Sequence, residues 1–168
     1  SLAQRLRRLR SHGMERTPAG LTFTEVSSNY RLTQFQAVLG QSQLPHLDDW
    51  IARRRELANR YSRVLSTMRD AGRLALPLSV PGHSWQTFMV VLSDGIERAS
   101  VVAALRERGI EAGPGAQSLS SIGLYGEASP TPVIGKMLAK QGLALPLYET
   151  LSDADVDRVC AALDEVVR

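Results

Sequence analysis

Apolar residues recur at helical spacing through much of the chain. Leu2, Leu6 and Leu9 share one side of a first segment that has arginines between them, a pattern typical of an amphipathic helix. Similar stripes predict helices over residues 2–10, 33–44, 46–68, 98–108, 132–141 and 152–167. Compact apolar runs predict short strands over residues 85–92, 110–112 and 143–147.

Local signals set the ends of several of these elements. Thr33 and Gln36 have the spacing of a capping box at a helix N-terminus. Ser152 and Asp155 repeat that spacing before the last helix. Pro45 lacks a backbone donor and clashes with the preceding helical turn, so it predicts a break between the second and third helices.

The order of elements predicts an α/β fold, in which helices pack on a short sheet as a small α+β layer. The run Phe88–Leu92 is apolar throughout, so both faces of that strand are expected to be covered. Tyr61 and Cys160 fall within apolar stripes and are expected in the interior. Residues 14–28 have no clear period and are expected to form a loop.

Composition narrows the classes of function. Of the 168 residues, 43% are hydrophobic and 22% charged, a balance typical of a globular domain. The single cysteine excludes an internal disulfide, and the three histidines lack metal-ligand spacing. No apolar run is long enough for a membrane span. These features predict a soluble, cytoplasmic chain with no membrane partner.

Two further features concern partners and completeness. A nucleic-acid partner bound through residues 2–10 is not favoured, because the net charge is only +3 and no recognition motif is present. The chain begins at Ser1, without a methionine and inside a predicted helix, so we expect a fragment. The apolar faces of residues 2–9 and 32–44 would then be exposed, which predicts self-association or poor solubility.

The best candidate for a binding site, on the residues alone, is the segment Ser-Ser-Asn-Tyr-Arg at positions 27–31. It lies directly before a predicted helix N-terminus, where hydroxyl, amide and guanidinium groups suit a phosphate or a carboxylate. An ordinary helix cap and loop would use the same residues, and that alternative stays open.

The segment from Asn29 to Leu44 resembles the N-Y-R-x-[ST]-x-x-Q-A-x-x-G-x-x-Q-L segment of the DegT/DnrJ/EryC1/StrS aminotransferases. These are pyridoxal-phosphate (PLP) enzymes of fold type I that aminate nucleotide-linked keto-sugars. Further similar segments follow in the family's order along the whole chain, at residues 47–58, 83–88, 109–111 and 145–156.

The resemblance implies that the chain is the C-terminal part of a fold type I enzyme. Residues 1–32 would be the tail of the large PLP-binding domain and an interface segment. Residues 33–168 would be the long interface helices and the small C-terminal domain. In the family, the lysine that binds PLP lies upstream of a segment like residues 2–13, so the resemblance implies that it is not in this chain. Lys136 and Lys140 fall on a small-domain helix and are expected to be solvated. No catalytic residue is therefore expected in this chain.

The resemblance also assigns candidate binding residues. Asn29 matches the asparagine that binds the PLP phosphate of the neighbouring subunit. Tyr30 and Arg31 are candidate substrate-binding residues, and Arg31 has the alternative of a structural ion pair at the dimer interface. Ser118 and Ser120 lie in the loop 113–126, where many relatives have a histidine that this chain lacks. They are expected either to bind the sugar or to belong to a solvated loop.

The implied activity is transfer of an amino group from an amino acid, expected to be glutamate, to a nucleotide-linked keto-sugar by a homodimer with PLP. The fragment alone is expected to be inactive. A non-catalytic dimerisation or scaffold remnant that pairs with a separate PLP-binding half is the alternative. The sequence does not choose between amination and PLP-dependent deoxygenation. It also leaves the sugar open, and the pathway could make an antibiotic sugar, a surface polysaccharide or a lipopolysaccharide.

Overall fold

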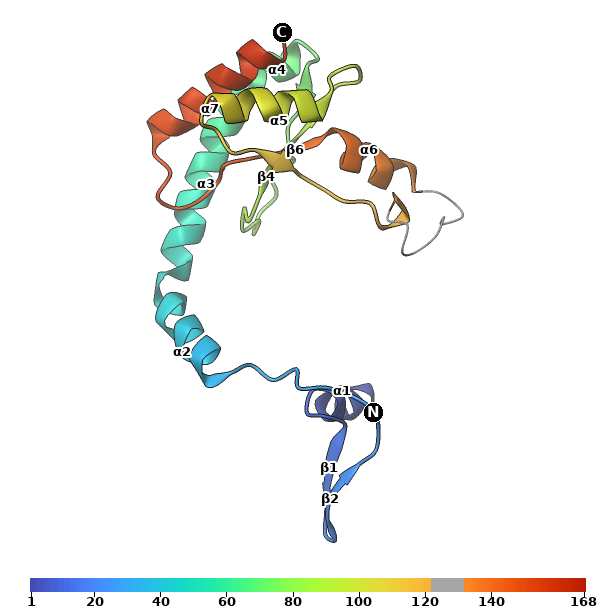
Figure 1. Cartoon of the computed structure of the whole chain (residues 1–168). Helices are drawn as coiled ribbons and strands as arrows, with labels where there is room; N and C mark the ends of the chain where they lie inside the picture. The colour runs from blue at the N-terminus through green and yellow to red at the C-terminus, as the bar shows by residue number, and fades with distance from the viewer. Residues whose placement is uncertain (122–131) are drawn as a thin grey trace. The chain divides into compact units, whose positions relative to one another are not determined.

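The computed structural model describes residues 1–121 and 132–168 (Figure 1). Its contacts divide the chain into two compact units, Ser1–Leu47 and Asp48–Arg168. The boundary expected after residue 32 concerns the domains of a complete enzyme and stays a prediction. No helix among the described residues is both long and apolar enough to cross a membrane.

The first unit contains two helices, a hairpin and a short 3-10 turn. Its elements are α1 (Leu2–Leu9), β1 (Met14–Thr17), β2 (Gly20–Phe23), α2 (Gln34–Gln43) and η1 (Leu44–His46). Thr33 caps α2, and its side chain and that of Gln36 form the predicted capping box. The predicted break at Pro45 is confirmed, because Pro45 lies in η1 between two α-helices.

The loop expected over residues 14–28 is wrong for residues 14–23. β1 and β2 form an antiparallel hairpin with Met14 opposite Phe23 and Thr17 opposite Gly20. All four residues of β2 are exposed, so the hairpin has no buried face that would impose an alternating apolar pattern. Its ladder of backbone hydrogen bonds leaves no such signature in the sequence.

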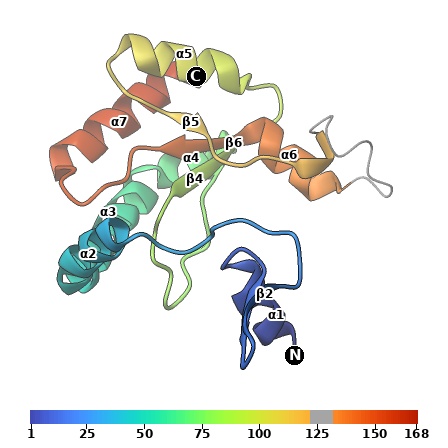
Figure 2. The same ribbon diagram turned by 60° about the horizontal axis from the view of Figure 1, so that its bottom comes forward.

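The second unit packs helices on a four-stranded antiparallel sheet. Its helices are α3 (Leu47–Val64), α4 (Ser66–Asp70), α5 (Arg98–Glu107), η2 (Leu119–Ser121), α6 (Val133–Gln141) and α7 (Asp153–Val166). Its strands are β3 (Leu74–Ala75), β4 (Phe88–Leu92), β5 (Gly113–Pro114) and β6 (Gly142–Leu145), in the order β3-β4-β6-β5. Figure 2 shows α5 and α7 running beside each other. The predicted layer of helices on a short sheet is confirmed.

Several expected boundaries differ from the structure, and the strand expected over 143–147 is Gly142–Leu145. The strand expected from residue 85 begins at Phe88, because Trp85 has a φ of 51°, which no strand residue adopts. The strand expected over 110–112 lies instead at Gly113–Pro114. The single long helix expected over 46–68 is instead two helices. The first, α3, ends at Val64, Leu65 departs from helical geometry, and α4 begins at Ser66.

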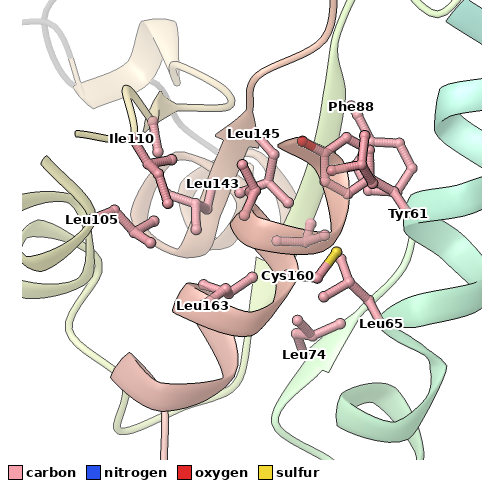
Figure 3. Close-up of a cluster of buried hydrophobic side chains, with 14 of the residues drawn as sticks. Tyr61, Leu65, Leu74, Phe88, Leu105, Ile110, Leu143, Leu145, Cys160 and Leu163 are labelled. Carbon is pink, nitrogen blue, oxygen red and sulfur yellow. The ribbon is translucent and has the colours of Figure 1, made fainter. Parts of the chain in front are cut away.

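The core of the second unit lies between the sheet and helices α3, α5 and α7. Figure 3 shows Tyr61 of α3, Phe88 of β4 and Cys160 of α7 pointing into it. The Tyr61 ring stacks on Phe88 with centroids 4.9 Å apart, and its hydroxyl donates to the Pro146 carbonyl at 2.9 Å. Burial raises the pKa of the Cys160 thiol to about 12, so it is an inert interior side chain, as expected.

Candidate functional site

Asn29 lies in an extended segment that pairs with the chain just after α1. Residues 24–30 run antiparallel to residues 10–13, and Ser11 faces Asn29 in an isolated bridge. Three backbone hydrogen bonds join the segments: Tyr30 N–H to the Arg10 carbonyl at 2.9 Å, His12 N–H to the Ser28 carbonyl at 3.0 Å, and Thr24 N–H to the Gly13 carbonyl at 2.9 Å. The predicted site is therefore attached to the end of α1.

The side chain of Asn29 is oriented by Arg31. Its Oδ1 accepts from the Arg31 backbone N–H at 3.1 Å and from the Arg31 Nε at 3.2 Å. Because both donors face Oδ1, the Nδ2 group points away from Arg31. Nothing in the described part of the chain accepts a hydrogen bond from this exposed Nδ2. It is a donor available to an anionic oxygen of a ligand.

Tyr30 and Arg31 are both exposed, and Tyr30 retains 72% of its accessible surface. No carboxylate of the described residues lies within 4 Å of the Arg31 guanidinium, and an ion pair at a dimer interface stays the alternative for Arg31. Its Nη groups remain open to a phosphate or a carboxylate, which a guanidinium binds with two parallel hydrogen bonds.

Ser118 and Ser120 lie in the second unit. Ser118 is 6% exposed, and the two hydroxyl oxygens are 2.8 Å apart, so each hydroxyl already has one partner in the protein. The backbone before them passes close to β4, because a Cβ built on Gly115 would lie 2.3 Å from the Met89 Cγ. Residues 122–126 of the loop considered in the sequence lie outside the described residues.

The two lysines occupy exposed positions on α6, as the sequence predicts. Lys136 and Lys140 have no ion pair with any residue that the structure describes. No group of three or more metal-ligating side chains occurs in residues 1–121 and 132–168.

Glu25 is a residue of this region that the sequence analysis did not single out. Its carboxylate accepts from Arg5 Nε at 2.7 Å and from Arg8 Nη2 at 3.1 Å. These hydrogen bonds hold the pKa of Glu25 below its ordinary value, and the one from Arg5 has the larger effect. The only signal in the sequence was the pair of arginines three residues apart on one face of a helix. It does not reveal which distant carboxylate they bind.

A hollow of about 470 Å³ lies beside this segment, lined by His12 and residues 23–27. The surrounding unit is basic, since residues 1–47 contain six arginines and only two acidic residues. In the part of the chain described, Arg7, Arg10 and Arg16 have no carboxylate within 4 Å. Unpaired guanidinium groups raise the local concentration of anions, so the first unit favours an anionic ligand or partner.

The first unit also exposes a large apolar surface. None of the hydrophobic side chains between residues 1 and 47, all of which the structure describes, is buried. The exposed ones with the largest open fractions include Leu2 at 73%, Phe23 at 70% and Phe35 at 79%. The apolar faces expected to be open over 2–9 and 32–44 are therefore open. Surfaces of this kind mark interfaces in a complete assembly.

Comparisons with known proteins agree with the resemblance in the sequence. The family model of the DegT/DnrJ/EryC1/StrS aminotransferases matches residues 1–164. The GDP-perosamine synthase of Caulobacter vibrioides is 32% identical over 171 residues of alignment, which cover 99% of this chain and 45% of that protein. The chain thus spans less than half the length of this curated relative.

Solved structures give the same picture. The aminotransferase TlmJ of Streptoalloteichus hindustanus is 29% identical, with a TM-score of 0.82 over 98% of this chain and 44% of that one. A putative sugar aminotransferase of Streptococcus pneumoniae in its PMP form, Spr1654, is 18% identical with a TM-score of 0.82, over 99% of this chain and 45% of that one, and shows the shared fold. The fold is thus that of part of a fold type I PLP-dependent aminotransferase. This chain belongs to the DegT/DnrJ/EryC1/StrS aminotransferase family.

Proposed function

We propose that this chain is the C-terminal part of a PLP-dependent aminotransferase that moves an amino group from glutamate to a nucleotide-linked keto-sugar. Membership of the family supports amino transfer, and the similarity to a GDP-perosamine synthase supports a nucleotide-sugar substrate. The PLP-binding lysine lies outside this chain in our proposal, so the chain alone is inactive. Its only lysines are the two exposed residues on α6.

The observation that carries the proposal is the free Nδ2 of Asn29. Its orientation is set by the two hydrogen bonds from Arg31, so it is preorganised as a donor. A phosphate oxygen is a suitable acceptor for it, and the basic surroundings favour that charge. When bound, PLP supplies the chemistry that carries the amino group between the two substrates. Asn29 would hold the cofactor's phosphate without taking part in the reaction.

The complete enzyme is a homodimer in this proposal, and Asn29 serves the PLP of the neighbouring subunit. The open apolar surface of the first unit supports a dimer, because without a core of its own this unit needs a partner surface. Residues 1–32 then end the large domain, and residues 33–168 form the interface helices and the small domain. We place the enzyme in the cytoplasm as part of the same proposal.

Substrate contacts are part of the same proposal, and they are assigned in each unit separately. The Arg31 Nη groups would bind the carboxylate of the amino donor or a substrate phosphate, with Tyr30 beside them. Ser118 and Ser120 would contact the sugar. Their mutual hydrogen bond and the burial of Ser118 leave Ser120 as the more accessible of the two.

The direct test is Asn29→Ala in the complete protein that carries this chain. PLP is removed and its dissociation constant is measured from the cofactor's absorbance on rebinding. We expect the dissociation constant to rise about tenfold or more, because a hydrogen bond to a charged group is worth roughly 1.5–3 kcal/mol. Asn59→Ala is the matched control, since Asn59 is an exposed asparagine on α3. Unchanged PLP affinity in Asn29→Ala would refute the role of Asn29.

The sequence of the reading frame upstream of Ser1 distinguishes the aminotransferase proposal from the scaffold alternative. A lysine in the segment that precedes α1 supports amino transfer, and a histidine in its place supports deoxygenation. A reading frame that lacks the PLP-binding half supports a non-catalytic dimerisation module instead. The open surface of residues 1–47 is the one observation that favours this second function.

A further inference from the structure

We infer that Glu25 is a positioning residue for Asn29. Its carboxylate joins Arg5 and Arg8 of α1, and this contact holds the returning segment 24–30 in the place from which Asn29 meets its ligand. The inference rests on the proposed function of Asn29, because it assigns the residue that fixes the location of that side chain.

The segment that carries Asn29 has no apolar anchor. Gly13 is the only buried residue of the first unit, whose 47 residues are all described. Hydrophobic burial, which fixes most segments of a protein, therefore cannot hold residues 24–30 within this chain. What remains are the backbone pairs to residues 10–13, the Thr24 hydroxyl on the Gly13 carbonyl, the Ser27 hydroxyl on the Leu9 carbonyl, and the carboxylate of Glu25.

Glu25 makes the contact that reaches farthest back along α1. Arg5 and Arg8 lie three residues apart on one face of the helix, and each binds a different oxygen of the carboxylate. The Glu25 side chain is 21% exposed, and that of Arg8 is 29% exposed. The contact runs through Arg8 Nη2, and the buried Arg8 Nε has no hydrogen-bond partner in the described part of the chain. Without Glu25, Arg5 would have no carboxylate partner among the described residues, and Arg8 would keep only Glu15 at 3.8 Å.

The backbone of Glu25 is also the tightest point of the segment. A Cβ placed on Gly13 would lie 1.9 Å from the Glu25 carbonyl oxygen, so the chain crosses Gly13 with no space to spare. Asn29 follows four residues later in an extended conformation, which spans at most about 14 Å. A shift of Glu25 away from α1 therefore displaces or loosens Asn29.

The experiment uses Glu25→Gln in the complete protein, which removes the charge and keeps the side-chain volume. Hydrogen exchange of the Tyr30 and His12 amides reports the pairing of the segment, since both donate across it. The PLP dissociation constant reports the position of Asn29. We expect exchange to be faster and PLP binding weaker by roughly threefold or more, with kcat unchanged at saturating PLP. Glu25→Asp keeps the charge and should recover part of both.

The matched control is Glu15→Gln. Glu15 also approaches Arg8, but at 3.8 Å, and it lies on the hairpin rather than on the segment of Asn29. It should change neither readout. Exchange of the Val90 and Leu143 amides in the sheet of the second unit shows whether a variant has lost its general fold.

The outcomes separate this inference from the proposed function. Unchanged exchange at Tyr30 in Glu25→Gln overturns the positioning role, whatever Asn29 binds. Faster exchange with unchanged PLP affinity also overturns it, provided that Asn29→Ala weakens PLP binding. Normal PLP binding by Asn29→Ala refutes the function proposed for Asn29 itself, even where Glu25→Gln loosens the segment.

Discussion

Arg60 of α3 and Asp157 of α7 lie 97 positions apart in the sequence and make a two-point contact between the two helices. Arg60 Nε lies 2.8 Å from Oδ1 of Asp157, and Nη2 lies 2.6 Å from Oδ2. The Arg60 Nη1 also reaches Asp153 at 2.8 Å, and Arg53 binds the same Asp153 at 2.9 Å. This ion-pair network joins α3 to the first turns of α7 through partly exposed side chains.

The planar guanidinium is needed for that contact, so Arg60→Lys should lower the thermal midpoint of unfolding. A lysine keeps the charge but offers a point charge in place of a fork. Because both side chains are partly exposed, we expect a decrease of only about 1–3 °C. Thermal unfolding followed by circular dichroism measures it. Arg106→Lys, at an exposed position on α5 without an ion pair to the described residues, serves as the control and should leave the midpoint unchanged.

The same network predicts that the free energy of unfolding decreases at acid pH. The hydrogen bonds from Arg60 hold the pKa of Asp157 below its ordinary value of 3.8. A carboxylate with a depressed pKa in the folded state stabilises that state at every pH above 3.8, and the contribution is lost as the pH falls through the lowered value. Stability should therefore be level near neutral pH and decrease below about pH 4.

Asp157→Asn tests the assignment of this acid decrease to Asp157. The variant should be less stable than the parent at pH 7, and the difference should shrink as the pH approaches 3, measured by urea unfolding at each pH. Glu107→Gln, which alters a solvent-exposed acid of α5 with no ion pair to the described residues, should give a curve parallel to that of the parent. A difference between parent and Asp157→Asn that is constant with pH would contradict the assignment.

What the sequence revealed depended on how local each signal is. The capping boxes at Thr33 and Ser152 are set by residues three positions apart, and both are present in the structure. The hairpin of β1 and β2 left no pattern because neither of its faces is buried against a core. An alternating apolar pattern in a strand reports a buried face, and no residue of this hairpin is buried.

In the candidate site too, local features could be predicted from the sequence and long-range contacts could not. The position of Asn29 before a capped helix could be predicted from the sequence, since the cap is local. The orientation of its amide by Arg31 depends on side-chain geometry two residues away, and the sequence alone does not fix it. The contact of Glu25 with Arg5 joins residues 20 positions apart. No periodic pattern encodes a pairing of that kind, so it needed the structure.

Tyr61→Phe should destabilise the second unit by about 1 kcal/mol. The substitution keeps the ring that stacks on Phe88 and removes only the hydroxyl, which leaves the Pro146 carbonyl without that donor. Tyr61→Ala also removes the ring and should cost about 3–5 kcal/mol through the cavity that it leaves. Urea unfolding measures both values. Equal losses in the two variants would mean that the hydroxyl, and not the ring, dominates the contribution of Tyr61.

Gly13→Ala should disturb the first unit more than an ordinary glycine substitution does. Gly13 has a φ of 70°, and Gly72 has a φ of 69°, so an added Cβ costs the same backbone strain at both positions. That strain is about 1 kcal/mol. The surroundings differ, because the Cβ at Gly13 meets the Glu25 carbonyl at 1.9 Å and the Cβ at Gly72 has nothing within 4 Å.

Gly72→Ala is therefore a control that isolates the steric contact. In the complete protein, Gly13→Ala should accelerate amide exchange at Thr24 and Tyr30, because the segment must move away from residues 10–13 to admit the methyl group. Gly72→Ala should leave those amides unchanged and lower only the stability of its own unit. If Gly13→Ala protects Thr24 and Tyr30 as well as the parent does, the close crossing of Glu25 over Gly13 does not exist in solution.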